Sequence, residues 1–479
     1  MRILFLIHRY LGIGIGILMA CWCLSGIVMM YAPYPCLSQE NRIAGLAPIE
    51  WQRVRESAGG ELLADDVLVD RFELEMFAGS PLLRLTLTDG RAYAIDLAAN
   101  SPTQEIGSKQ AIAAATSYAQ GHGLVSTGAI EAERIQFDQW TVGGFRGDRP
   151  LYRVELQDSA GSEVYVSSHT GKIVQATTRT RRFLGWIGAV PHWLYPSMLR
   201  QNAALWTQVV VYTSLLGIFL TAIGLFIGIR QLSWRDKTAA SRSPYRGVML
   251  WHHVPGLIFG ILTLTWVTSG MLSMNPWGLM EGGDVMADRH RLMGASPSFR
   301  EIKQLIEAMR VRALPAIQSI ESAPLDGGLF VVATFGDGAR ARFDAGAMAR
   351  PITTDEIKGA AKRIGGATST WEIIREPDLY HYSLLEQRAI LPAVRIISPS
   401  ANYYYLDALS GKLINEADAG SKAYRWWHSG LHRLDFSPLS RTQTFRNLVM
   451  LPLLFGAALV AGTGAFIGLR RIWPKALRR

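Results

Sequence analysis

Cysteine is scarce in this chain, and its placement follows no metal-binding pattern. Only Cys21, Cys23 and Cys36 occur among 479 residues, with no CxxC or CxxCH sequence. This excludes a zinc site built from paired cysteines, a disulfide framework and the covalent attachment of a c-type haem. We interpret the three thiols as small, apolar packing groups.

Nucleotide-binding motifs are missing too. The chain has no Walker loop and no zinc-protease motif, and the glycines at positions 12, 14 and 16 follow no strand and lie within an apolar run. They indicate a helix-packing surface, so we expect no NADPH or FAD bound by a Rossmann domain.

The formal net charge is +10, but the basic residues gather beside apolar runs as topology signals. We therefore expect no nucleic acid as a partner.

Charge is absent from four long apolar runs, at residues 10–31, 203–229, 254–279 and 447–469. About 20 apolar residues span a hydrocarbon core of about 30 Å, so each run predicts a transmembrane helix. The first run is longer than the core of a signal peptide, and no small-x-small cleavage site follows it. It therefore predicts a retained anchor.

The runs divide the chain into eight predicted segments: helix 1 at 1–31, an outer domain at 32–202, helix 2 at 203–229, a loop at 230–250, helix 3 at 251–279, a second outer domain at 280–446, helix 4 at 447–469 and a tail at 470–479. The loop and the tail are rich in Arg and Lys. This predicts a bacterial inner-membrane protein with cytoplasmic termini and two large periplasmic segments. Alternating strands around Asp89-Gly90 and Asp337-Gly338, with helices at 108–120 and 355–364, predict an α+β domain in each segment.

The sequence repeats itself. Six residues within or just before the first run recur 244 positions later at the third run. They are His8, Gly12, Gly16, Trp22, Ser25 and Gly26, matched by His252, Gly256, Gly260, Trp266, Ser269 and Gly270. At a spacing of 240, His432 matches His192. The predicted fold class is therefore an α-helical membrane protein with four transmembrane helices, made from a duplicated helix–domain–helix unit with two α+β outer domains.

The matched histidines predict a pair of cofactor sites. Two copies with the same orientation are related by a twofold axis along the membrane normal, so His8 and His252 would meet near the cytoplasmic surface and His192 and His432 near the outer surface. Two neutral imidazoles on opposite faces of a b-type haem complete six-coordinate iron suited to electron transfer. We expect two haem b groups, held non-covalently, that form an electron path across the membrane.

Each histidine also has a structural interpretation. A lone histidine beside a tryptophan at a membrane edge, such as His192, is typical of an interfacial anchor. Four matched histidines favour ligation, because polar groups at membrane depth are rare without a function. His253 and His428, which lie next to or near the matched residues, stay open as alternative ligands or as partners of the ligands.

Two sets of motifs resemble a known family. The segment at 404–413, YYLDALSGKL, looks like the closing strand of a PepSY domain. The segments HRYLG at 8–12, WHH at 251–253 and WHSGLH at 427–432 resemble the PepSY-associated transmembrane helix family, and the likeness covers nearly the entire chain. That family is similar to inner-membrane, haem-carrying reductases, some of which reduce ferric siderophores on the periplasmic side. The resemblance implies PepSY-like outer domains and an oxidoreductase with a ferric siderophore as electron acceptor.

The expected partners follow from this hypothesis. Besides membrane lipid, the chain needs an electron donor, either a membrane quinol or a separate reductase, because it has no flavin or nicotinamide motif. We predict no catalytic acid or base, since one-electron transfer requires proximity and matched potentials. Two alternatives stay open: a PepSY-type regulatory or binding protein without redox activity, and a transporter of metal or haem. Transport would require polar residues at mid-membrane, and the four runs contain few.

Overall fold

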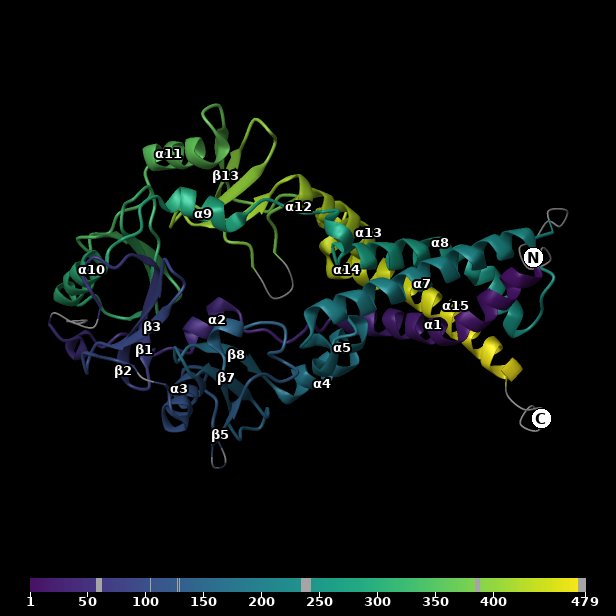
Figure 1. The fold of residues 1–479 in the computed structure, drawn as a ribbon, viewed down its shortest axis with the longest axis horizontal. Helices are drawn as coiled ribbons and strands as arrows, with labels where there is room; N and C mark the ends of the chain where they lie inside the picture. Colours follow the sequence, from purple (N-terminus) through teal and green to yellow (C-terminus); the bar gives the residue numbers. More distant parts are fainter. Residues whose placement is uncertain are drawn as a thin grey trace. The chain divides into compact units, whose positions relative to one another are not determined.

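The structure, a computed structural model, describes residues 1–56, 63–103, 105–126, 128, 130–233, 243–383 and 388–472 (Figure 1). The chain divides into two compact units. The helical unit consists of Met1–Tyr34, Arg181–Glu281 and Gly420–Arg479, and the sheet unit consists of Pro35–Thr180 and Gly282–Ala419. Each unit therefore takes segments from both halves of the sequence.

Among the described residues, four helices are long and apolar enough to cross a membrane, so the chain is a multi-pass membrane protein, as predicted. They are α1 (Arg2–Met29), α7 (Ala203–Arg230), α8 (Val248–Leu272) and a span that joins α14 (Gln443–Phe445), the π-helical η7 (Arg446–Met450) and α15 (Leu451–Ile472). The helix α8 ends before its apolar run does, because Asn275 adopts the left-handed conformation and Pro276 follows it.

The four long helices form a ring. The helix α1 packs against α7 and α15, and α8 packs against the same two helices, so α1 and α8 are diagonal. Glycines allow the close approach: a Cβ at Gly456 would clash with Phe259, and one at Gly468 would clash with Ile13. The two repeated sequences, in α1 and α8, therefore lie on opposite sides of the bundle centre.

Short elements complete the helical unit. The helix α5 packs on α1, and α13 packs on α8. The bounds of the short elements are α4 (Arg179–Ile187), α5 (Ala189–His192), α6 (Ser197–Arg200), η4 (Pro276–Gly278), α12 (Ala419–Tyr424), the π-helical η5 (Arg425–Gly430), α13 (Leu431–Arg433) and η6 (Pro438–Arg441). The elements α5 and α13 thus bring the second repeated histidine, His192 or His432, against the long helix of its own half.

The sheet unit is organised around a seven-stranded antiparallel sheet that both halves of the chain build together. Its order is β11-β10-β9-β1-β2-β3-β4, with β1 (Val69–Phe77), β2 (Ser80–Leu87), β3 (Ala92–Asp96) and β4 (Ser101–Pro102) from the first half and β9 (Ile317–Ser322), β10 (Phe330–Phe335) and β11 (Arg340–Asp344) from the second. The strands β1 and β9 pair directly. The two outer segments therefore share one sheet.

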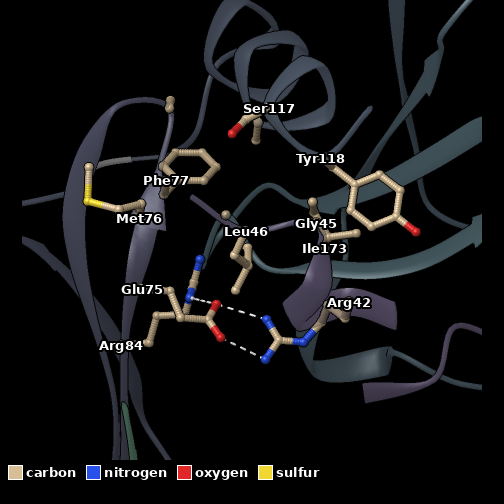
Figure 2. A pocket seen from close by; sticks show the side chains of 13 residues that line it. Arg42, Gly45, Leu46, Glu75, Met76, Phe77, Arg84, Ser117, Tyr118 and Ile173 are labelled. Carbon is tan, nitrogen blue, oxygen red and sulfur yellow. Dashed lines mark hydrogen bonds and ion pairs between the residues drawn. The ribbon is translucent and has the colours of Figure 1, made fainter. Parts of the chain in front are cut away.

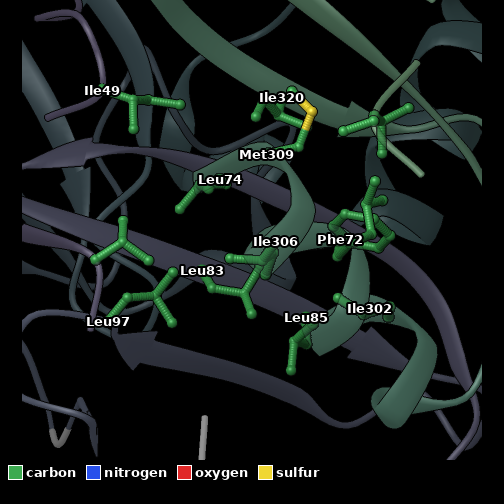
Figure 3. Close-up of a cluster of buried hydrophobic side chains, with 14 of the residues drawn as sticks. Ile49, Phe72, Leu74, Leu83, Leu85, Leu97, Ile302, Ile306, Met309 and Ile320 are labelled. Carbon is green, nitrogen blue, oxygen red and sulfur yellow. The ribbon is translucent and has the colours of Figure 1, made fainter. Parts of the chain in front are cut away.

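Successive side chains of a strand point to opposite faces of the sheet, and here both faces carry buried apolar side chains. On one face, Leu74, Leu83 and Ile320 pack with Ile302 and Ile306 of α10 (Phe299–Arg312) in a core drawn from both halves (Figure 3). The helix begins at a capping box in which the Ser298 hydroxyl accepts from the Glu301 backbone N–H. Side chains at the alternate positions point to the other face.

That other face carries two smaller modules, one from each half. The strand order in the first is β5-β6-β7-β8, with a helix, α3, and in the second β12-β13-β14-β15, with a helix, α11. Their bounds are α3 (Ser108–Gly121), β5 (Glu131–Ile135), β6 (Leu151–Glu155), β7 (Glu163–Ser167), β8 (Ile173–Thr177), α11 (Thr354–Gly365), β12 (Thr370–Ile374), β13 (Ala393–Ile397), β14 (Tyr403–Asp407) and β15 (Leu413–Ala417). The predicted α+β character of both segments is thereby confirmed. Short connecting helices are α2 (Gln39–Ala44), η1 (Trp51–Arg53), η3 (Arg146–Asp148) and α9 (Val285–Met293).

Candidate functional site

The helical unit brings His8 and His252 together. Their ring centroids lie 6.1 Å apart, with the ring planes at 39°. The Nδ1–H of His8 donates to the carbonyl of Leu220 on α7 at 3.2 Å, and that of His252 donates to the carbonyl of Val460 on α15 at 3.0 Å. Because a carbonyl oxygen only accepts, Nδ1 carries the proton and Nε2 keeps a lone pair. Both rings are therefore held in the tautomer that ligates metal through Nε2.

His192 and His432 form a second pair with the same construction. Their ring centroids lie 6.0 Å apart, with the ring planes at 66°. Their Nδ1 atoms each donate at 3.0 Å to a carbonyl, that of Trp22 on α1 for His192 and that of Trp266 on α8 for His432. The predicted pairing of all four histidines is thus present as ring-to-ring proximity in the described chain.

Four glycines make room for the four imidazoles. A Cβ at Gly224 would lie 2.6 Å from Cε1 of His8, and one at Gly464 would lie 2.7 Å from Cε1 of His252. In the outer pair the corresponding distance is 3.2 Å for both Gly26 and Gly270. Sequence reasoning noticed the second pair of glycines and missed Gly224 and Gly464, although their spacing of 240 repeats that of the histidines.

The distance between the ring centroids can be compared with the distance that a shared metal ion would give. Two metal–nitrogen bonds of about 2.0 Å, plus about 1.2 Å from each nitrogen to its ring centroid, place the centroids about 6.4 Å apart. The observed 6.1 Å and 6.0 Å agree with this. No group of three or more His, Cys, Asp or Glu residues that could hold a metal ion occurs in the described ranges. Two imidazoles alone suit a metal whose other ligands come from a planar macrocycle, as in a b-type haem.

His253 lies next to His252 but has both ring nitrogens engaged. Its Nδ1 lies 2.7 Å from the Ser243 hydroxyl, and its Nε2 lies 2.9 Å from the carbonyl of Gly228. The side chain is buried at this position. A nitrogen that hydrogen-bonds to a carbonyl carries a proton and offers no lone pair, so this arrangement favours His252 over His253 as a ligand.

His428 lies beside the outer pair instead of across from His192. Its ring stacks on that of His432 with centroids 5.1 Å apart and planes at 23°. It is carried by the π-helical segment η5, and the first half has Gly188 in its place. This arrangement favours His432 as the ring opposite His192, with His428 as its neighbour.

Two indoles with buried Nε1 atoms accompany the outer pair. Trp22 and Trp266 supply the carbonyls that orient His192 and His432, and the Nε1 atom of each indole is buried without a hydrogen-bond partner among the described residues. Trp266 packs with Leu454 of α15 in an apolar cluster. The symmetric unpartnered N–H groups are consistent with a polar or aromatic group lying between the two helices.

The sheet unit holds a separate buried cluster of charges (Figure 2). Glu75 accepts from both terminal nitrogens of Arg42, at 2.7 Å and 2.8 Å, and from Arg84 at 2.8 Å. Burial alone would raise the pKa of Glu75, but the charges of Arg42 and Arg84 outweigh that effect and hold the pKa well below its usual range. Because these charges are mutually satisfied, the cluster indicates a structural role.

No family model, no curated protein and no solved structure matches this chain. The function is therefore argued from the geometry of the two histidine pairs.

Proposed function

We propose that this protein is a di-haem b electron-transfer protein of the bacterial inner membrane that reduces a periplasmic ferric siderophore. The observation that carries the proposal is the repeated construction of the two pairs. In each pair the centroids of the two imidazoles lie about as far apart as a shared metal would place them, and a backbone carbonyl orients each ring. Haem supplies reversible one-electron chemistry when it is bound between such rings.

The protein's own residues would position and insulate the two centres. His8 lies in the second turn of α1, whereas Trp22 and Gly26, which contact His192, lie near its end. About 16 residues of helix separate the two levels, which corresponds to about 24 Å along the axis. The pairs would therefore lie in opposite leaflets of the bilayer, with apolar helices excluding water between them.

The proposed direction of electron flow follows the expected topology. The loop and the tail rich in Arg and Lys favour the cytoplasmic side for the His8–His252 end, where a quinol or a separate reductase would supply electrons. Each turnover passes one electron to the His192–His432 end and from there to the Fe(III) of the chelate. The resulting Fe(II) is released, because hard oxygen ligands hold Fe(II) far less tightly than Fe(III).

The visible spectrum of the purified protein tests this proposal. We expect a sharp Soret band that shifts on reduction with dithionite, and about two haems per chain. Oxidation of the reduced protein by a ferric siderophore should then restore the first spectrum. A protein that stays colourless after haem is supplied during expression would overturn the proposal and leave a regulatory or binding role.

A further inference from the structure

Immediately after their outer histidines, the two halves of the helical unit share one backbone turn but differ in the side chains that it carries. His192 is followed by Trp193-Leu194-Tyr195, and His432 is followed by Arg433-Leu434-Asp435. Both leucines adopt the left-handed conformation, with φ of 49° and 52°. The local turn is therefore retained while its side chains differ.

In the first half these side chains build an aromatic cluster, defined as Tyr34, Trp193, Tyr195 and Trp206. The Tyr195 ring lies at its centre, with centroids 5.6 Å from Tyr34, 5.7 Å from Trp193 and 5.4 Å from Trp206, each in edge-on geometry. The indole N–H of Trp206 donates to the carbonyl of Trp193 at 2.9 Å. Tyrosine and tryptophan are common at membrane interfaces as single anchors, but these four gather around one ring.

Arg200 of α6 lies against this aromatic cluster. Its guanidinium carbon is 4.6 Å from the Trp206 ring centroid and 5.3 Å from that of Tyr195. Its Nε and one terminal nitrogen are buried and have no hydrogen-bond partner within the part of the chain that the structure describes. The side chain as a whole is only partly buried, so its charge can be reached from solvent. A cation held against aromatic rings without a counter-charge among the described residues favours an incoming anion.

The corresponding charges of the second half are already paired. Asp435, which matches Tyr195 in the repeat, accepts from Arg441 at 2.8 Å and lies 3.3 Å from Arg425. On one side of the outer histidine pair, an approaching acceptor thus meets two arginines that already contact the carboxylate of Asp435. On the other side the acceptor meets the aromatic cluster and Arg200, which forms no ion pair with a described carboxylate.

We propose that Arg200 and the aromatic cluster form the docking site for an anionic iron chelate that itself carries aromatic rings, as a catecholate complex does. The inference rests on the proposed electron-transfer function, because Trp193 directly follows His192 and so places the chelate beside the outer pair. The guanidinium would donate to the anionic oxygens, and the indole and phenol rings would stack on the catechol rings. One electron then converts the bound Fe(III) to Fe(II), and no bond to the protein forms.

Binding of redox-inert gallium chelates tests this site without any electron transfer. The probes are the trianionic tris complex of gallium(III) with catechol and the neutral tris complex of gallium(III) with acetohydroxamate, titrated calorimetrically into the detergent-purified full chain. We expect the catecholate complex to bind more tightly than the neutral one. Arg200→Gln should weaken catecholate binding about tenfold, because a charge-assisted hydrogen bond is lost. Trp193→Leu should weaken it severalfold.

The matched control is Arg433→Gln, which removes an exposed positive charge at the position that corresponds to Trp193. It should leave catecholate binding unchanged, whereas equal losses in Arg200→Gln and Arg433→Gln would reduce the effect to diffuse charge and overturn the site. Unchanged binding in both Arg200→Gln and Trp193→Leu would also overturn the docking site, and the cluster would then be an interfacial lipid anchor.

If Arg200→Gln does not fold, Arg200→Lys keeps the charge and should retain part of the affinity. Because gallium binding requires no haem, a colourless protein that binds the chelate would defeat the electron-transfer function and not the docking site.

Discussion

Glu73 and Glu321 lie directly opposite each other in the β1–β9 pair, one from each half of the chain. Like charges in this position are destabilising unless they are compensated. Lys172 of the first small module binds Glu73 at 2.8 Å, and Lys412 of the second binds Glu321 at 2.9 Å. The sheet unit thus repeats the arrangement of the helical unit, in which equivalent residues of the two halves face each other.

The inner histidine pair is tested by His8→Ala and His252→Ala. Each variant should lose about half of the haem of the purified protein, because one site loses an axial ligand while the outer site is untouched. The measurement is haem per chain from the pyridine haemochrome spectrum. His253→Ala is the control, since both nitrogens of His253 are already hydrogen-bonded, and it should retain its haem. Undiminished haem in both His8→Ala and His252→Ala would refute the pairing.

Ser25 and Ser269 are expected to tune the outer centre. Their hydroxyl oxygens lie 3.3 Å and 3.2 Å from Nδ1 of His192 and His432, as second acceptors for the ring N–H groups. A stronger bond from Nδ1–H makes the imidazole more basic, which favours Fe(III) and lowers the reduction potential. Ser25→Ala or Ser269→Ala should raise the potential of one centre by at most roughly 40 mV, equivalent to about 1 kcal/mol for one electron.

A spectroelectrochemical titration measures this shift. Only one of the two reduction steps should move, and the haem content should stay constant. Ser273→Ala is a suitable control, because Ser273 donates to the carbonyl of Gly270 on the same helix and does not approach a histidine nitrogen. Equal shifts of both steps, or a shift in the control, would contradict a direct effect on the outer ligands.

The lysines that neutralise the opposed carboxylates should contribute to stability. Lys172→Met leaves Glu73 largely buried without its ammonium partner and should lower the free energy of unfolding by about 1 kcal/mol. The double variant Lys172→Met/Lys412→Met should lose more than the sum of the single variants, because the two opposed carboxylates then repel each other with both ammonium groups gone and Arg42 left on Glu73. Thermal unfolding followed by tryptophan fluorescence measures the effect. Lys358→Met, which removes an exposed ion pair with Asp355, should change little, and an equal loss there would argue against the opposed charges.

Stability should also fall in acid because of Glu75. Its pKa in the folded chain lies below the unfolded value of about 4.3, so its contribution is fully present above that pH and is lost as the pH falls below it. The thermal midpoint should therefore decline as the pH falls below about 4.3. Glu75→Gln should be less stable at pH 7 and should show a shallower decline. Parallel curves for the two proteins would show that another group controls the acid limb.

Local sequence patterns predicted much of the fold. The four spans follow from runs without charge, and the hairpins around Asp89-Gly90 and Asp337-Gly338 follow from turn chemistry, with both glycines at positive φ. The pairing of β1 with β9 could not be predicted in this way. It joins strands nearly 250 residues apart, and nothing in either strand specifies which edge it will meet.

The sequence by itself determined that the chain crosses a membrane four times, that it is a duplication and that its histidines recur in matched positions, because hydropathy and repetition are local properties. Only the tertiary structure decided which histidine of the pair at 252 and 253 faces the bundle centre. The two side chains project about 100° apart on one helix, and only the packing of α7 and α15 gives His252 its carbonyl at Val460 and consumes both nitrogens of His253. For the same reason the sequence did not predict the contact of Arg200 with Tyr195 and Trp206, because these residues belong to separate elements that only packing brings together.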